Sequence, residues 1–131
     1  MSSNQQPRSS VATLIYVVDD EPLLLDMAEV SLLGEGYQLK KFSDPAAAFS
    51  SFTSEPSKPA LLLTDYAMTP WNGLELSEKC KAAHPSLKIL MVSGTVTEDI
   101  ARGTNVRLDG FIAKPYLPST LAHTVRALLL A

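Results

Sequence analysis

The chain has 131 residues, of which 46% are hydrophobic and 19% charged, and its formal net charge is -3 at pH 7. This length fits one compact domain and leaves no room for a second of ordinary size. Neither sign of charge forms a long run, which argues against direct binding to nucleic acid.

The only cysteine is Cys80, so an intramolecular disulfide is excluded and a reducing, cytoplasmic location is expected. The first ten residues, MSSNQQPRSS, are polar and have no apolar core of an export signal. No apolar run approaches the ~20 residues that a membrane-spanning helix needs. We therefore predict a protein without a membrane segment, in which residues 1–11 are a flexible segment and residues 12–131 form the domain.

Short apolar segments alternate with helical patterns along the chain. In order, the predicted elements are a strand over Leu14–Val18, a helix over Glu21–Leu33, a strand over Tyr37–Phe42, a helix over Asp44–Phe52, a strand over Ala60–Thr64, a helix over Asn72–Ala83, a strand over Ile89–Val92, a short helix over Thr97–Arg102, a strand over Phe111–Ala113 and a helix over Pro118–Leu130. Most of the strands are unbroken apolar runs, which is typical of parallel strands covered on both faces. The strand with two lysines, Tyr37–Phe42, suits a sheet edge. The alternation predicts an open parallel α/β sheet.

Chemically capable side chains follow four of the predicted strands. Asp19 and Asp20 follow the first, Asp65 ends the third, Ser93 follows the fourth and Lys114 follows the fifth. Because ligands of such sheets bind beyond the carboxyl ends of the strands, we expect one site there. Three neighbouring carboxylates repel one another unless a cation lies among them, and oxygen-only ligation favours Mg²⁺. Since Mg²⁺ prefers to share phosphate oxygens with a substrate, the pattern predicts phosphoryl chemistry with an aspartate nucleophile.

These residues lie in four motifs, VVDDEP, LLLTDYAMTPWNGLEL, MVSGT and FIAKP. In this order and at these spacings, the motifs resemble the receiver domain of two-component response regulators, the family of the chemotaxis response regulator. The resemblance covers about Thr13 to Ala131. It implies a flavodoxin-like, doubly wound five-stranded parallel sheet of order 2-1-3-4-5 with helices on both faces. It also implies a signalling switch rather than an enzyme that acts on a free metabolite.

The resemblance assigns the acids to metal binding and phosphorylation. Asp65 corresponds to the residue that accepts the phosphoryl group. Asp20 would bind Mg²⁺ directly, and Asp19 would bind it through a water or hold the other ligands. Ala67 would supply its backbone carbonyl to the same ion, which Asp65 also contacts.

The resemblance also implies a set of switch residues. Ser93 and Lys114 would contact the phosphoryl group, and Phe111 matches the switch aromatic, although an ordinary core position suits it equally well. The Lys114–Pro115 peptide is expected to be cis. Gly73 corresponds to the glycine that opens the helix after the acceptor loop.

By the same resemblance, the partner is a sensor histidine kinase or a histidine phosphotransfer protein. A homodimer through the fourth helix, fifth strand and fifth helix is also implied. On the first helix, Leu24, Met27, Ala28 and Leu32 are expected to face the core. Leu23 and Val30 either extend that core-facing stripe, which we favour, or dock the helical domain of a kinase.

The sequence leaves two alternative functions open and argues against two others. The chain can be the receiver part of a larger regulator or hybrid kinase, or an interaction module of the same fold that is never phosphorylated. A phosphohydrolase would need a second acid two residues after its nucleophile, where this chain has Ala67. A flavodoxin-like electron carrier would need a phosphate-cradling loop after the first strand, and the sequence DDEP would repel a phosphate there.

Overall fold

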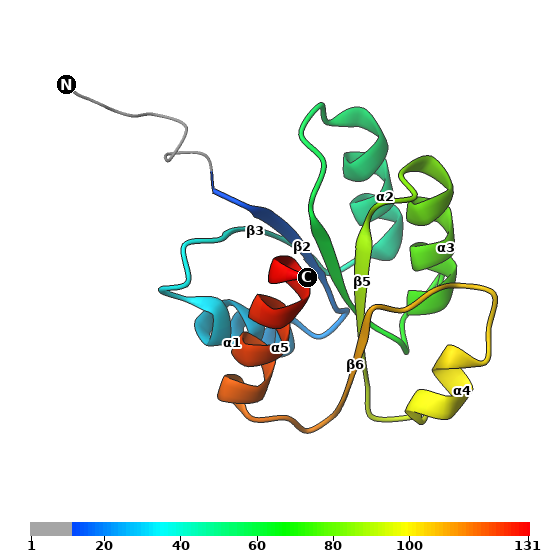
Figure 1. Cartoon of the computed structure of the whole chain (residues 1–131). Coiled ribbons are helices and arrows are strands. Elements are labelled where there is room, and N and C mark those ends of the chain that lie inside the picture. The colour runs from blue at the N-terminus through cyan, green and yellow to red at the C-terminus, as the bar shows by residue number, and fades with distance from the viewer. Residues whose placement is uncertain (1–11) are drawn as a thin grey trace.

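The structure, a computed structural model, describes residues 12–131, so the segment expected to be flexible at residues 1–11 lies outside the described residues. Strands and helices alternate along the chain (Figure 1). In order, they are β2 (Leu14–Val18), α1 (Pro22–Leu32), β3 (Gln38–Phe42), α2 (Pro45–Ser54), β4 (Leu61–Asp65), α3 (Gly73–Ala83), β5 (Lys88–Ser93), α4 (Glu98–Arg102), β6 (Gly110–Ala113) and α5 (Pro118–Leu130). Each predicted strand and helix is present, with its ends shifted by no more than two residues.

The five strands form one parallel sheet of order β3-β2-β4-β5-β6. Numbered along the chain, this is the order 2-1-3-4-5, so the predicted fold class is confirmed. The strand with the two lysines, β3, pairs only with β2 and is an edge of the sheet. Lysine side chains there discourage pairing with another chain.

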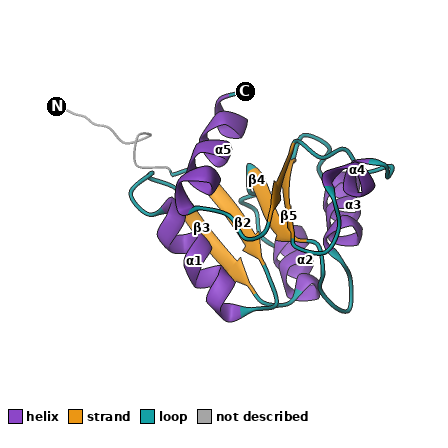
Figure 2. Cartoon of the chain, turned by 90° about the horizontal axis from the view of Figure 1, so that it is seen from below, coloured by secondary structure: helices purple, strands orange, loops and turns teal. Residues whose placement is uncertain are grey.

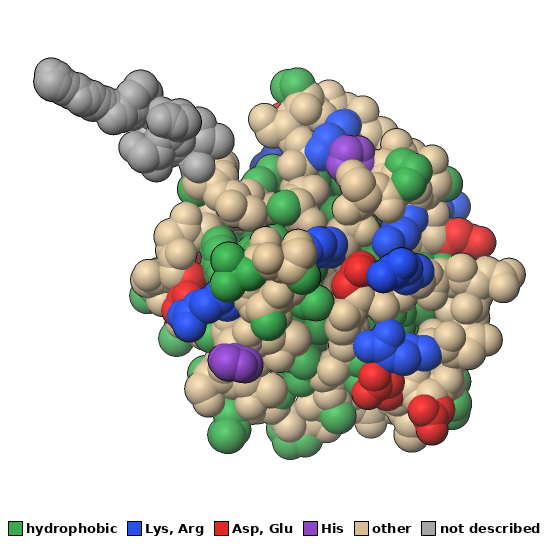
Figure 3. Space-filling view, in the orientation of Figure 1, with side chains coloured by type: hydrophobic (Ala, Val, Ile, Leu, Met, Phe, Trp, Pro, Cys, Tyr) green, Lys and Arg blue, Asp and Glu red, His purple; other side chains and the backbone are tan. Residues whose placement is uncertain are grey.

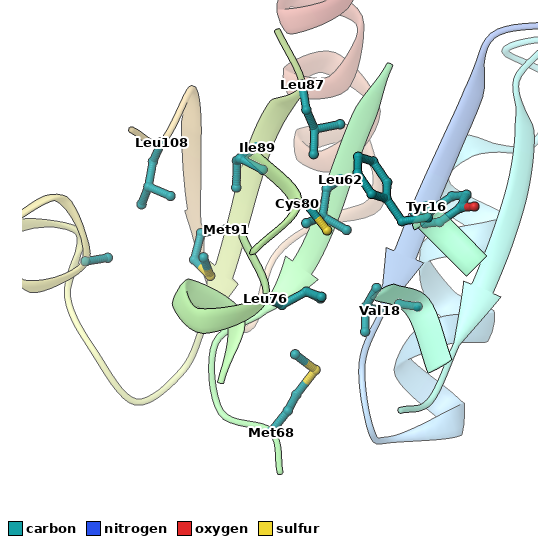
Figure 4. Close-up of a cluster of buried hydrophobic side chains, with 13 residues drawn as sticks. Tyr16, Val18, Leu62, Met68, Leu76, Cys80, Leu87, Ile89, Met91 and Leu108 are labelled. Atoms are coloured by element: carbon teal, nitrogen blue, oxygen red, sulfur yellow. The ribbon is translucent and has the colours of Figure 1, made fainter. Parts of the chain in front are cut away.

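Helices cover both faces of the sheet (Figure 2). α1 and α5 lie on one face, and α2, α3 and α4 lie on the other. Successive strand residues point to opposite faces, so Ile15 and Val17 join the cluster under α1 and α5, whereas Tyr16 and Val18 join the cluster under α2 and α3. Figure 4 shows the second of these clusters. Burial on both faces explains why the strands read as continuous apolar runs.

The core-facing stripe of α1 differs from the prediction. Three residues at positions i, i+3 and i+7 are buried, namely Leu25, Ala28 and Leu32. Leu24 is only half-buried, and Met27 is 41% exposed instead of facing the core. Leu23 and Val30 are 70% and 67% exposed, so their favoured assignment to the core was wrong. The inward stripe is centred on Leu25, which turns Leu23, Met27 and Val30 outward.

The helix ends follow local chemistry. Asp44 caps α2 by accepting a hydrogen bond from Ala46 N at 3.0 Å. α4 is a short helix, as predicted, and the Thr97 side chain accepts a hydrogen bond from Ile100 N at its start. α5 begins at Leu117 without a side-chain cap. Within residues 12–131, no helix is long and apolar enough to cross a membrane.

Candidate functional site

Three carboxylates meet at the carboxyl edge of the sheet. Asp19 and Asp20 follow β2, and Asp65 is the last residue of the neighbouring strand β4. One oxygen of each lies within 4.8 Å of the others. Asp19 and Asp65 are each only 7% exposed, whereas Asp20 is open to solvent. The sheet therefore brings together the acids that the sequence pattern singled out.

The turn between β2 and α1 fixes the position of Asp19. Its backbone N–H donates to Phe42 O on β3 at 3.1 Å, and its Oδ1 accepts from the backbone N–H of Glu21 at 3.0 Å. Glu21 occupies the cap position of α1 but its own side chain makes no capping hydrogen bond. Asp19 thus satisfies one of the free N–H groups at the helix start and remains oriented toward the site.

Lys114 supplies the positive charge of the site. It follows β6, and its backbone N–H donates to Ser93 O at 2.8 Å. Its Nζ lies 3.0 Å from Asp19 Oδ2 and 3.0 Å from Asp65 Oδ1. One ammonium therefore joins two buried carboxylates that belong to different strands.

Burial and the neighbouring charges raise the pKa values of both Asp65 and Lys114. Burial raises the pKa of Asp65, the hydrogen bond from Lys114 lowers it and the charge of Asp19 raises it, so that the net shift is upward. Burial lowers the pKa of Lys114, but its hydrogen bonds with Asp19 and Asp65 together outweigh burial, and the net pKa is raised. Lys114 is therefore a cation throughout the physiological pH range.

The donor set fits a hard divalent cation. The three side chains present only carboxylate oxygens, which Mg²⁺ prefers, and their spacing allows them to share one ion. Ala67 lies two residues beyond Asp65 in the loop between β4 and α3 and is exposed. The three acids thus fit a site for a divalent cation in both chemistry and spacing.

Ser93 lies on β5, next to the strand of Asp65, and Phe111 lies on β6, the strand beyond it. Ser93 is 2% exposed at the end of β5, opposite Ala113 of β6. Its Oγ accepts hydrogen bonds from Thr95 N at 3.1 Å and Val96 N at 3.0 Å. Phe111 pairs with Met91 and packs, half-buried, against the cluster under α2 and α3.

Two peptide bonds beside the site are cis. One is Lys114–Pro115, as the resemblance implied, and the other is Thr69–Pro70 in the loop after Asp65. The same loop closes on itself through a hydrogen bond from Gly73 N to Tyr66 O at 2.8 Å.

Gly73 packs directly on the strand that carries Asp65. A Cβ atom at this position would lie 2.3 Å from Asp65 O and 2.8 Å from Met91 Sδ. Real Cβ atoms do not approach other atoms so closely, so only glycine fits here. The start of α3 is therefore held against the end of β4.

Tyr116 is a member of the site region that sequence analysis did not single out. It is half-buried, and burial raises its pKa, while Lys114 lowers that pKa and Asp19 raises it. With Leu24 and Ala28 of α1 it helps to line a small cavity of about 10 Å³ behind the acids. The sequence feature that could have identified Tyr116 is an aromatic residue two positions after Lys114.

The sequence matches the family profile of the response regulator receiver domain over residues 15–126. Among characterised relatives, the DNA-binding response regulator MtrA of Mycolicibacterium smegmatis is 30% identical over 115 residues, which cover 88% of this chain and 50% of MtrA. The probable transcriptional regulatory protein TcrX of Mycobacterium tuberculosis is 27% identical, over 88% of this chain and 49% of TcrX. The chain thus spans about half the length of these relatives.

Solved structures show the same arrangement of helices and strands. A CheY-like response regulator receiver domain protein from Methanospirillum hungatei JF-1 has a TM-score of 0.81 at 27% identity, covering 91% of this chain and 94% of that one. The BeF3-activated DrrB receiver domain has a TM-score of 0.80 at 18% identity, covering 92% and 100% of the two chains, which supports the fold alone. Together with the family match, these findings show that the chain belongs to the response regulator receiver domain family of two-component signalling.

Proposed function

We propose that Asp65 accepts a phosphoryl group from the phosphohistidine of a sensor histidine kinase or histidine phosphotransfer protein. The observation that carries this proposal is the position of Lys114, whose Nζ lies 3.0 Å from both Asp65 Oδ1 and Asp19 Oδ2. Three acids alone would repel a phosphoryl group, whereas a cation held beside the nucleophile attracts it.

In the proposed step, a carboxylate oxygen of Asp65 attacks phosphorus. An O–P bond forms while the P–N bond to the donor imidazole breaks, and the electron pair of that bond stays on the imidazole nitrogen. Lys114 then balances charge on the phosphoryl oxygens, and the Ser93 hydroxyl donates a hydrogen bond to one of them. Such a transfer depends on positioning and charge neutralisation, so the domain promotes its own phosphorylation without acting on a free metabolite.

Asp19, Asp20, Asp65 and the backbone carbonyl of Ala67 are proposed to hold Mg²⁺. When bound, the ion neutralises charge on the acids and on the transferred group. Asp20 is open to solvent and Asp19 is already engaged by Lys114 and Glu21 N, which favours Asp20 as the more direct ligand.

Phosphorylation is proposed to switch the face formed by α4, β6 and α5. The phosphoryl group carries about 1.5 to 2 negative charges in place of the single charge of the Asp65 carboxylate, and it draws Ser93 and Lys114 toward its oxygens. Phe111, which is half-buried on β6, would reorient as the population shifts. Ile100 and Leu117 are 61% and 69% exposed at this face, which supports the proposal that a homodimer or a downstream protein binds there.

The exposed stripe on α1 is proposed to receive the helical partner that donates the phosphoryl group. Leu23, Met27 and Val30 lie at positions i, i+4 and i+7, so they form one apolar row that runs along the helix from the site. Hydrophobic side chains are visible over α1 and α5 in Figure 3. A row with this spacing matches the apolar face of a partner helix.

Phosphorylation can be tested with a small-molecule phosphodonor. The protein is incubated with the donor and Mg²⁺, and its intact mass is measured, while beryllium fluoride binding is followed by Trp71 fluorescence. We expect a phosphoryl-sized mass gain and a fluorescence change in the wild type, and neither in Asp65→Asn. The control Asp26→Asn changes an exposed acid on α1 and should behave as wild type. A wild type that shows neither signal would favour the alternative, an interaction module that is never phosphorylated.

Within a longer regulator, such as the relatives of which this chain spans about half, the same switch would act on the attached part. We propose that residues 12–131 themselves work in the cytoplasm through protein contacts. Size-exclusion chromatography with and without beryllium fluoride tests the homodimer, which should appear only with the analogue.

A further inference from the structure

Trp71 lies in the loop between β4 and α3, the loop that also carries Ala67. Its ring centroid is 5.9 Å from that of Phe49 on α2, and the two rings are nearly perpendicular, at 78°. On α3, Lys79 Nζ lies 4.5 Å from the centroid of the indole ring. Side chains from two different helices thus hold Trp71.

Both contacts are directional. An edge-to-face aromatic pair and a cation over an indole ring each favour one orientation of the ring. In the described part of the chain, Lys79 takes part in no ion pair within 4.0 Å, so the ring is its one assigned partner. The orientation of Trp71 is therefore set by α2 and α3 and not by its own loop.

Backbone hydrogen bonds and the buried side chain of Met68 hold the base of the loop. Tyr66 N donates to Val92 O of β5 at 2.9 Å, and Gly73 N donates to Tyr66 O at 2.8 Å. Met68 is 6% exposed and extends into the cluster toward Leu76 (Figure 4). Ala67 lies between Tyr66 and Met68, which are both anchored. Ala67, Thr69 and Pro70 are themselves exposed. Among residues 67–71, Met68 and Trp71 are the two whose side chains fix the loop to the body of the domain.

We infer that Trp71 is a positioning residue for the metal site. By holding the outer part of the loop between α2 and α3, it restricts the backbone path through Ala67, the residue proposed to offer its carbonyl to the ion. This inference rests on the proposed function, because it concerns the ion that Asp19, Asp20 and Asp65 are proposed to bind. Trp71 itself contacts neither the ion nor the phosphoryl group.

Two measurements test the inference. Calorimetric titration with Mg²⁺ gives the affinity of each variant, and amide hydrogen exchange of the metal-free protein reports on the bond from Gly73 N to Tyr66 O. We expect Trp71→Ala to weaken Mg²⁺ binding about tenfold, as loss of a residue that orients a metal ligand typically does. It should also speed exchange at Gly73. Trp71→Phe keeps an aromatic ring against Phe49 and should recover most of the affinity.

Lys79→Met separates the two contacts, because it removes the cation over the ring and retains an apolar side chain. It should weaken Mg²⁺ binding less than Trp71→Ala does. The matched control is Val106→Ala, which trims a half-buried side chain of the same cluster but outside the loop. It should lower stability without changing Mg²⁺ affinity or exchange at Gly73.

The outcomes separate the inference from the proposed function. Trp71→Ala with wild-type Mg²⁺ affinity and wild-type protection at Gly73 overturns the inference while the metal site stands. A wild type that does not bind Mg²⁺ overturns the metal site, and the inference with it. Should Trp71→Ala not fold, Lys79→Met and Phe49→Leu decide, because unchanged affinity in both would contradict a positioning role.

Discussion

The ammonium of Lys114 lies 3.0 Å from Asp65 Oδ1, so the proposed phosphoacceptor already holds a counterion before any metal or phosphoryl group arrives. Both side chains are largely buried, with 18% and 7% of their surfaces exposed. Removing one partner of such a pair leaves the other charge without compensation in a poorly solvated place. The stability of the metal-free domain therefore depends on Lys114.

Replacement of Lys114 tests this dependence. Lys114→Met should lower the free energy of unfolding of the metal-free protein by about 1 to 3 kcal/mol, because Asp19 and Asp65 lose their shared cation. Mg²⁺ should recover part of this loss by supplying another positive charge. Urea denaturation with and without Mg²⁺ measures both effects. The control Lys41→Met removes two ion pairs at the surface between β3 and α1 and should change stability little. Equal losses in the two variants would contradict the role of Lys114.

Because the pKa of Asp65 is raised, we expect the stability of the metal-free protein to depend on pH. Burial is the largest cause of the shift, the hydrogen bond from Lys114 opposes it, and the charge of Asp19 adds to it. Because the folded-state pKa is above the usual value of 3.8, the folded protein binds this proton more tightly than the unfolded chain does. The contribution of the group to stability is thus fully present below pH 3.8 and is lost as the pH rises through the folded-state pKa.

Asp65→Asn removes that titration. In the absence of metal, the variant should gain thermal stability over the wild type as the pH rises from 3 toward 7, while the two melt alike near pH 3. Scanning calorimetry in a chelating buffer measures the difference at each pH. Asp44→Asn, in which an amide replaces the carboxylate that caps α2, is the control and should follow the wild type. A difference that does not vary with pH would argue against a buried, destabilised carboxylate at position 65.

Gly73 provides a test of the packing between α3 and β4. Gly73→Ala places a methyl group 2.3 Å from Asp65 O and 2.8 Å from Met91 Sδ, so one or both must move. We expect a loss of about 2 to 3 kcal/mol in the free energy of unfolding and weaker Mg²⁺ binding, because the displaced backbone carries Asp65. At Gly94 the nearest atom to a new Cβ is 3.4 Å away, so Gly94→Ala is a control for stability. Similar stability of the two variants in urea would contradict this account.

The thiol of Cys80 reports on opening of the core. Cys80 is 1% exposed on the inner face of α3, and burial raises its pKa to about 12 from the usual 9.0. Its contribution to stability is present below pH 9 and declines as the pH rises toward 12, because only the unfolded chain releases the proton easily. We expect thiol reagents to label the native protein at pH 8 only at the rate of unfolding. Rapid labelling without denaturant would contradict the buried position.

Much of this fold could be predicted from the sequence because its signals are local. Continuous apolar runs such as Leu61–Leu63 identify buried parallel strands, and Gly73 or Gly103 mark helix boundaries. The acids were placed at one edge because all parallel strands end on the same side. The strand order itself came with the family resemblance and not from periodicity.

Other features depend on contacts that no local pattern encodes. The rotation of α1 that exposes Met27 and Val30 is set by which of several leucines fits between α1 and the sheet, and Leu25 occupies that place. The pairing of Lys114 with Asp19 joins residues 95 positions apart. The position of Trp71 between Phe49 and Lys79 likewise joins two helices and a loop. These contacts arise only when the layers are assembled.

The hydroxyl of Ser93 has a restricted chemistry at the end of β5. Its oxygen has two lone pairs, and the N–H groups of Thr95 and Val96 already use both. The hydroxyl therefore has only its hydrogen to donate, and Thr95 Oγ1 at 3.3 Å is the present partner that an incoming group would replace. The hydroxyl can donate a hydrogen bond to an anionic oxygen, but it has no free lone pair for a cation. The end of β5 therefore favours an incoming anionic group.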